Sequence, residues 1–382
     1  MISNRITMDL STDGFMRPIV ERLNPQQQSN PQEILQFKKT CPGSTMTAPN
    51  DEQLQKDDIF GAYVSSWVAW AVDPQIRNAG SSAGVLTALS NWLISTGRVN
   101  SVKASAEGQS DPRRTVPLTI TSREEALIAA GSRYAPVANL SNLTREDFRD
   151  SAIVGKPCEA SAIRQYADAL QIPKEDRPIV MSFFCAGTPS QHATNALAEL
   201  LEAPVDEIES LRYRGNGWPG EFTITLTSGD KKTMSYDKSW GKHLGRTVQW
   251  RCKICVDGTG GHSDIAVGDY WEVDQKGYPT FENADGRSVV IARTARGDEL
   301  LQLAANTGVI VTQPLNLSHV AAVQPLQTDR KQTLAARLAG RRIAGKQIPR
   351  YRGYGLIRIA KTTGKRNIRA FAGTFVRTRQ DR

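Results

Sequence analysis

Two neighbouring segments decide the fold of this chain: "SAIVGKPCEASAIRQYADAL", residues 151–170, and "RPIVMSFFCAGTPSQHATNALAELL", residues 177–201. Each begins with a short apolar run that predicts a strand, passes through a turn that carries a cysteine, and ends in apolar residues at helical spacing. The second strand is expected over 179–184. Its helix should be capped near Thr188 or Ser190, with Pro189 in the first turn.

Strand, helix, strand and helix in this order predict a right-handed parallel unit. The expected class is therefore α/β, with a mixed, largely parallel sheet flanked by helices. Both turns of such a unit open at the carboxyl edge of the sheet, where ligands usually bind. We expect Cys158 and Cys185 to lie side by side at that edge. Two buried structural thiols are the alternative, because free cysteine packs like a small hydrophobic residue.

Two further cysteines, Cys252 and Cys255, form a C-x-x-C within "QWRCKICVDGTGGHSDIAVGDYW", residues 249–271. Four thiolates suit either a tetrahedral zinc ion or a [4Fe–4S] cluster. His262 offers a rival zinc set with the C-x-x-C. A thioredoxin-like redox pair is disfavoured, since that motif should follow a strand and open a helix. Spacing alone leaves zinc and iron–sulfur open, within an irregular loop.

A glycine-rich stretch, "RNAGSSAGVLTALSNWLISTGRVN", covers residues 77–100. Its apolar residues from Val85 to Leu93 recur at helical spacing, and Gly97 is a suitable stop. The helix should therefore begin within "GSSAG". Small residues and free N–H groups at that start favour an anion such as a phosphate, although such helix starts are also common without a ligand.

Positive charge is concentrated at the C-terminal end. Of the 48 Lys and Arg residues, 16 lie in 330–382 beside a single acid, Asp381, so this segment carries +15 and the rest −6. Its first half, with Leu334, Leu338 and Ile343, predicts a helix with an apolar stripe, and "YGLIRIAK" predicts a strand or a second packed segment. The segment is expected either to pack on the body or to meet an acidic electron partner or membrane surface. We expect no nucleic acid.

The remaining composition is that of an ordinary globular chain, with 39% hydrophobic and 23% charged residues. The N-terminal residues do not resemble a secretory signal, and the most apolar stretch is too short to span a bilayer. Five cysteines without export signals predict reduced thiols in a cytoplasmic protein.

Several motifs, in order from about Phe60 to about Gly308, resemble the beta subunit family of coenzyme F420 hydrogenases and dehydrogenases. "GSSAGVLTALSNWLISTGRVN" is similar to the family's glycine-rich flavin segment, and "AAGSRYAPV" (129–137) to its Gly-Ser-Lys-Tyr motif. "VGKPCEASAIR" and "SFFCAG" resemble its first two cysteine motifs. "YRGNGWPG", "CKICVDGTGGHSDIAVGDYW" and "SVVIARTARGDELL" continue the likeness.

The resemblance implies FAD and [4Fe–4S] cofactors. It implies cluster ligands at Cys158, Cys185, Cys252 and Cys255. It implies flavin contacts, by position, at Ser81, Ser82, Gly84, Thr87, Gly131, Ser132, Arg133 and Tyr134. Chemically, Arg133, which replaces a usual lysine, is better suited to hold a phosphate or a substrate carboxylate than to donate a proton. Ala83, Lys156 and Glu159 are further departures from the family pattern.

Many relatives carry an N-terminal ferredoxin-like cysteine array that this chain lacks. One cluster is therefore expected, and Cys41 is expected to be structural or free. The expected parts are an arm over 1–59, a cofactor-binding oxidoreductase domain over 60–310 and a basic extension over 311–382. No catalytic acid or base is assigned; His262 and Asp269 are candidates, and Asp269 equally suits a role in orienting its loop.

The resemblance implies electron transfer between coenzyme F420, or a comparable hydride donor or acceptor, and a redox partner such as ferredoxin. The alternatives are a ferredoxin-dependent reductase of a small organic substrate and a non-catalytic zinc-stapled binding domain.

Overall fold

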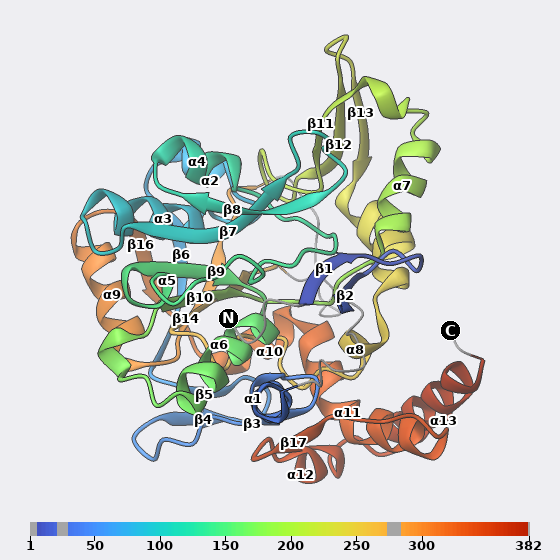
Figure 1. Cartoon of the computed structure of the whole chain (residues 1–382). Helices are drawn as coiled ribbons and strands as arrows, with labels where there is room; N and C mark the ends of the chain where they lie inside the picture. The colour runs from blue at the N-terminus through green and yellow to red at the C-terminus, as the bar shows by residue number, and fades with distance from the viewer. Residues whose placement is uncertain (1–5, 21–29, 273–283, 381–382) are drawn as a thin grey trace.

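The computed structural model describes residues 6–20, 30–272 and 284–380. Its centre is an eight-stranded sheet (Figure 1). Across the sheet the strands are β16 (Ile310–Pro314), β6 (Ser65–Ala71), β15 (Ser288–Ala292), β14 (Ile265–Asp269), β10 (Ile179–Phe183), β9 (Ser151–Gly155), β7 (Ser101–Glu107) and β8 (Thr115–Ile120).

The sheet is mixed, as predicted. Its parallel part is the four central strands β14, β10, β9 and β7, and the pairings on both sides of them are antiparallel. Parallel strands need covering on both faces, which explains the continuous apolar runs of β9 and β10. The carboxyl ends of these central strands therefore meet at one edge of the sheet.

The two segments that predicted the fold form the expected units. Helix α6 (Pro157–Ala169) follows β9, and α7 (Gln191–Leu200) follows β10. One detail differs, because Ser190 is the N-cap of α7 and accepts the backbone N–H of His192. Pro189 therefore precedes the cap and does not lie in the first turn.

Alternating side chains of the strands build two core layers. On one face Val290 and Ala292 pack with α3 (Val85–Ser95) and α9 (Ala295–Asn306). On the other face Val289 and Ile291 pack with α10 (Leu317–Val323). The period of two along β15 thus fixes which helix lies on which side of the sheet.

Shorter elements surround this core. The helices are α1 (Pro31–Thr40), α2 (Pro74–Ala79), α4 (Arg123–Ile128), α5 (Asp147–Asp150) and α8 (Trp250–Lys253). A separate three-stranded sheet consists of β11 (Ile208–Arg212), β12 (Glu221–Leu226) and β13 (Lys231–Ser235). Two-stranded pairs are β1 (Ile6–Leu10) with β2 (Met16–Val20), β4 (Gln55–Asp57) with β5 (Gly61–Tyr63), and β3 (Thr45–Thr47) with β17 (Arg350–Arg352).

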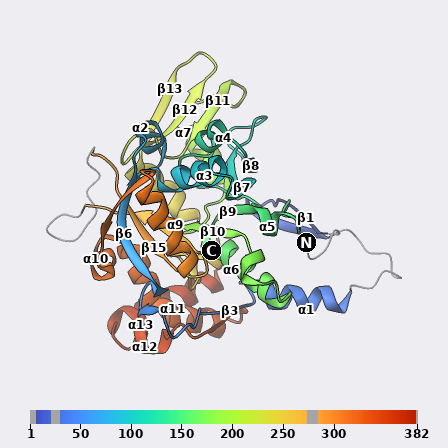
Figure 2. The ribbon, with the colours of Figure 1, turned by 90° about the vertical axis from the view of Figure 1, so that its left-hand side faces the viewer.

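The C-terminal segment folds into α11 (Pro325–Ile343), α12 (Leu356–Ala360) and α13 (Lys365–Arg379). Both views place these helices at the opposite end of the molecule from the three-stranded sheet (Figures 1 and 2). Leu334 and Leu338 of α11 are buried, as expected, but Ile343 is 64% exposed because it is the last residue of the helix. The strand expected in "YGLIRIAK" is wrong, since Gly355 in a left-handed conformation starts α12 there.

The C-terminal segment packs on the body of the protein. Leu334 and Leu338 share a core cluster with Met46, Ile254 and Val256, and β17 pairs in parallel with β3 of the N-terminal arm. The last sheet strand, β16, extends to Pro314, beyond the domain boundary expected at 310. That three-part division stays a prediction. Among the described residues no helix is long and apolar enough to cross a membrane.

Candidate functional site

A large cleft opens at the carboxyl ends of β9, β10 and β14, between them and the start of α3. It holds about 1730 Å³ of space, part of it open to solvent. All eight residues expected to surround a flavin line this one cleft: Ser81, Ser82, Gly84, Thr87, Gly131, Ser132, Arg133 and Tyr134. The two stretches that supply them, 81–87 and 131–134, are joined by a hydrogen bond of 2.8 Å from the Ser132 hydroxyl to the Ser81 hydroxyl.

The eleven-residue helix α3 begins at the cleft. Its N-cap is Gly84, at a φ of 71°, and no side chain caps the first N–H groups. A Cβ at Gly84 would lie 2.5 Å from the carbonyl oxygen of Ile76, so α2 and α3 could not approach as closely with another residue there. The start of α3 therefore offers unpaired N–H groups and a positive helix end to whatever occupies the cleft.

Arg133 does not fit its expected role. Its guanidinium donates to the carbonyl oxygens of Leu211, Pro112 and Arg114 and to the Thr115 hydroxyl. It also lies over the ring of Tyr213. With its donors directed into the protein, Arg133 shapes the wall of the cleft and is not placed to bind a phosphate or a carboxylate.

The four cysteines expected as cluster ligands come together beside the cleft. Cys158 lies in the first turn of α6, and Cys185 follows β10 and lines the cleft. Cys252 lies within α8, whose last residue is Lys253, and Cys255 follows that helix. A Cβ on Gly187, two residues after Cys185, would lie 3.2 Å from the Cβ of Cys252. All are free thiols. Because the C-x-x-C ends a helical turn rather than opening a helix, it lacks the thioredoxin-like arrangement.

Burial and neighbouring thiols both raise the pKa of Cys158, Cys185 and Cys255. Burial and the neighbouring Cys252 and Cys255 together raise the pKa of Cys185 to about 12. Burial likewise raises the pKa of Cys158 and of Cys255. A group that binds thiolates would have to overcome this cost through its own positive charge or through nearby cations.

Cationic side chains do surround the cysteines. Lys156 and Arg251 act on Cys158, and Arg330 acts on Cys185 and Cys255. Arg330 comes from α11 and donates 2.8 Å to the carbonyl oxygen of Cys185. A Cβ on Gly258 would collide with its guanidinium, so the loop after the C-x-x-C admits Arg330 only because glycine stands there.

The rival zinc site finds no support in this geometry. Throughout the described ranges, no three or more His, Cys, Asp or Glu side chains lie close enough to share one metal ion. His262 points elsewhere, with its Nε2 at 3.1 Å from the Tyr354 hydroxyl. Burial lowers the pKa of His262 to about 4, which keeps the ring neutral near pH 7. His262 also does not line the cleft, so it is not placed as an acid or base for a ligand there.

Lys156 and Glu159, two of the departures from the family pattern, compensate each other. Their side chains form an ion pair of 2.5 Å that lines the cleft, and both are largely buried. Burial alone would lower the pKa of Lys156, but the Glu159 carboxylate raises it above its ordinary value. The chain thus introduces two charges near Cys158 while keeping their sum at zero.

Replacing Glu159 with alanine should lower the free energy of unfolding by about 3 kcal/mol, because it leaves a buried ammonium without its partner. The double variant Lys156→Thr with Glu159→Gln removes both charges and should recover most of that loss. Urea unfolding of the purified protein measures both changes. Equal destabilisation by the single and the double variants would contradict the compensation.

Arg214 is a site residue that the sequence did not single out. It is 1% exposed, lines the cleft, and lies against the rings of Trp218, Tyr236 and Trp271 at 4.5 to 4.9 Å. Its Nη1 donates 2.6 Å to Asp269, whereas its Nη2 is buried without a partner among the described residues. Asp269 therefore orients Arg214, and its expected role in orienting the loop stays a prediction. Arg214 lies in the motif "YRGNGWPG", which resembles the family. The motif does not show that this arginine is buried in the cleft wall.

Comparison with known proteins agrees with this architecture. The family model described as coenzyme F420 hydrogenase/dehydrogenase, beta subunit N-term, matches residues 66–144, and the model for the C terminus of the same subunit matches 148–317. The chain belongs to this oxidoreductase family. Both matched regions together contain most of the residues that line the cleft, all four cysteines of the candidate cluster site and Arg214.

Individual relatives support the assignment. The chain is 27% identical to coenzyme F420 hydrogenase subunit beta of Methanococcus voltae over 304 residues, which cover 76% of this chain and 99% of that protein. It is 27% identical to F420-dependent formate dehydrogenase 1 subunit beta of Methanococcus maripaludis, over 64% of this chain and 60% of that one. A chain in the F420-reducing [NiFe] hydrogenase complex of Methanosarcina barkeri shares the fold, with a TM-score of 0.56, 22% identity, and 75% and 96% coverage.

Proposed function

We propose that this protein passes electrons between coenzyme F420, or a comparable hydride donor or acceptor, and a partner protein, through FAD in the cleft and one [4Fe–4S] cluster on the four cysteines. Its relatives are named as F420-linked hydrogenase and formate dehydrogenase subunits, which makes F420-linked redox chemistry the first expectation. The observation that carries the proposal is that Cys185 lines the same cleft as all eight expected flavin residues. A flavin and a cluster would then be neighbours.

Polar groups of the cleft that have no hydrogen-bond partner among the described residues suit a flavin nucleotide. The start of α3 presents N–H groups suited to a pyrophosphate. Two buried polar atoms of residues that line the cleft, Arg214 Nη2 and Asn139 Oδ1, have no hydrogen-bond partner among the described residues. Arg214 Nη2 would donate to an oxygen of the ligand, and Asn139 Oδ1 would accept from one of its N–H or O–H groups. The aromatic side chains of Trp240 and Trp271 provide flat apolar walls.

The four gathered cysteines suit an anionic iron–sulfur cluster, because four thiolates are the usual ligands of a [4Fe–4S] cluster. Lys156, Arg251 and Arg330 would offset the negative charge of such a cluster. Cys41 lies beside Arg251, since both approach the Cβ position of Gly43, and we keep it outside the ligand set.

The protein's own residues would position and isolate the reacting groups. Bound FAD would supply the exchange between two-electron hydride chemistry and the single electrons that a cluster accepts. Asp269 holds Arg214 in place at 2.6 Å, and the surrounding rings shield this pair from water. Because the Asp269 carboxylate raises the pKa of Arg214 against the effect of burial, Arg214 stays charged at any pH of interest.

Anaerobic purification tests the proposal directly. The protein should be brown, contain about one FAD and four irons per chain, and be reduced by the reduced form of F420 more rapidly than by NADPH. Reduction only by ferredoxin, an acidic electron carrier, would favour the ferredoxin-dependent reductase of a small substrate. A colourless protein would instead favour the zinc-stapled binding domain and would overturn the proposal.

Replacing Ser81 with leucine should lower the FAD content several-fold while the iron content stays close to wild type, because the larger side chain fills the cleft. Ser81→Ala is the matched control, since it removes the hydroxyl without adding bulk. We prefer this pair to Gly84→Val, whose Cβ would collide with the backbone of α2 and disturb the fold as well as the flavin. Full FAD content in Ser81→Leu would place the flavin elsewhere. FAD and iron are measured on the same preparation.

A further inference from the structure

The C-terminal helices carry an exposed cationic surface beside the candidate cluster loop. Helix α13 has five cationic residues and no acid. Lys365, Arg369, Arg377 and Arg379 are exposed, and we call these four the α13 basic face. Lys365, Arg369 and Arg379 share one side of the helix. Arg377 lies about 80° further round the helix from Arg369, at 3.6 residues per turn.

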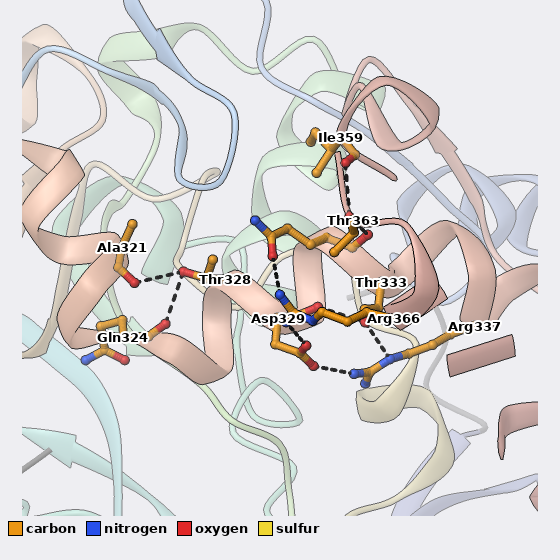
Figure 3. Close-up of polar contacts among 10 residues, drawn as sticks. Ala321, Gln324, Thr328, Asp329, Thr333, Arg337, Ile359, Thr363 and Arg366 are labelled. Atoms are coloured by element: carbon orange, nitrogen blue, oxygen red, sulfur yellow. Dashed lines mark hydrogen bonds and ion pairs between the residues drawn. The ribbon is translucent and has the colours of Figure 1, made fainter. Parts of the chain in front are cut away.

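Within the described residues, ion pairs do not neutralise the charge of the α13 basic face. Asp329 of α11 pairs with Arg337 and with Arg366 (Figure 3). Among the residues that the structure describes, no ion pair is made by any residue of the basic face itself. A helix with four unpaired cations repels itself in isolation and attracts negative surfaces at the distance of a Debye length.

Exposed apolar side chains lie among these charges. Ile368 is 71% exposed and Val376 is 48% exposed on α13. Such side chains cost free energy in water and contribute to binding once a partner covers them. Cations around apolar residues are the composition expected of a surface that recognises an acidic protein.

Contacts connect this surface to the C-x-x-C loop. Arg337 of α11 donates to the carbonyl oxygen of Lys253, which stands between Cys252 and Cys255. Lys253 and Arg341 both lie over the ring of Trp250, at 5.1 and 4.7 Å. Arg377 of the basic face is close enough to Lys253 for their like charges to repel. The end of α13 and the cluster loop are therefore parts of one positively charged region.

We propose that the α13 basic face docks an acidic electron-carrier protein and brings it to the candidate cluster on the side away from the cleft. This inference rests on the proposed function, since it assigns the partner of the same electron path. The face lies beyond residues 66–317, the part of the chain that the family models match. A small substrate could then enter the cleft while the partner occupies α13.

Charge reversal tests the docking surface without removing any buried residue. The variant Arg369→Glu with Arg377→Glu should lower the rate of reduction by a plant-type [2Fe–2S] ferredoxin about tenfold at low ionic strength, because electrostatic steering is lost. Its rate should also depend less on salt than the wild-type rate. The control Lys231→Glu with Lys238→Glu changes the net charge equally, on exposed residues near the three-stranded sheet at the far end of the molecule (Figure 1). FAD content, iron content and reduction by dithionite are measured on all three proteins.

Binding of the ferredoxin, measured separately by calorimetry, distinguishes failure of docking from failure of the proposed function. Weaker binding and slower reduction in the α13 variant alone support the docking surface. Wild-type binding by the α13 variant, or an equal loss in the control, overturns it. Salt-dependent binding at α13 without any electron transfer would overturn the proposed function and leave the docking surface standing.

Discussion

Replacing Cys255 with serine is expected to remove most of the iron from the anaerobically purified protein, whereas Cys41→Ser should leave the iron content unchanged. Cys255 is half-buried near Cys252 and Cys185. Its thiolate would complete the ligand set, and a serine hydroxyl is a poor ligand for iron. Cys41 is separated from that set in the chain and lies against Arg251 at the end of α1. Iron per chain, measured with the absorbance of the cluster, provides the readout.

Cys41→Ser is a stringent control because Cys41 lies near the four candidate ligands. Arg251 is close enough to Cys41 and to Cys158, Cys252 and Cys255 for all four thiols to act on its charge. Folding of both variants can be checked by circular dichroism, since neither substitution changes the volume of the side chain much. Equal iron loss from Cys41→Ser and Cys255→Ser would show that Cys41 belongs to the ligand set. Retention of iron in Cys255→Ser would show that the cluster is bound elsewhere.

The sequence predicted the parts of the site that depend on local pattern. Strand–turn–helix spacing placed Cys158 and Cys185 at the ends of neighbouring parallel strands, and helical spacing placed the start of α3 within "GSSAG". Resemblance to the family then added positions 131–134, which the structure brings to the same cleft. Each of these features is fixed by a few consecutive residues, which is why reading along the chain was sufficient.

The features that the sequence missed depend on contacts between distant segments. The guanidinium of Arg133 is directed away from the cleft by the carbonyl oxygens of Leu211 and Pro112, about 80 and 20 residues away. Arg214 becomes a site residue only because Trp271 and Asp269 meet it from β14 and the loop beyond. No periodicity or motif records such partners, because they are set by how the elements pack.

The basic tail illustrates the same limit at larger scale. Its charge left open whether the segment packs on the body or meets an acidic partner. The structure packs α11 against Ile254 and Val256 of the cluster loop and inserts Arg330 over Gly258. The prediction that the tail packs on the body is therefore confirmed. The sequence showed the apolar stripe of α11, but it did not show that Met46, Ile254 and Val256 form the surface that the stripe covers.

Deleting residues 330–382 is accordingly expected to remove both the iron and the solubility of the protein. The deletion takes away Leu334 and Leu338 and exposes Met46, Ile254 and Val256, which are at most 4% exposed in the intact chain. It also removes Arg330, one of the cations beside Cys185 and Cys255. Soluble expression, iron per chain and the midpoint of thermal unfolding measure the result.

Single substitutions in α11 separate the effect of lost packing from the effect of lost charge. Leu334→Ala should lower the free energy of unfolding by about 3 kcal/mol, since it leaves a cavity under the cluster loop. Ile343→Ala, at an exposed position of the same helix, should change the free energy of unfolding by less than about 0.5 kcal/mol.

Arg330→Met, which keeps the bulk of the side chain, should leave the protein soluble and lower the reduction potential of the cluster, because a positive charge that favours the electron is lost. A truncated protein that stays soluble with full iron would contradict the packing role, and would make the whole segment a detachable docking arm.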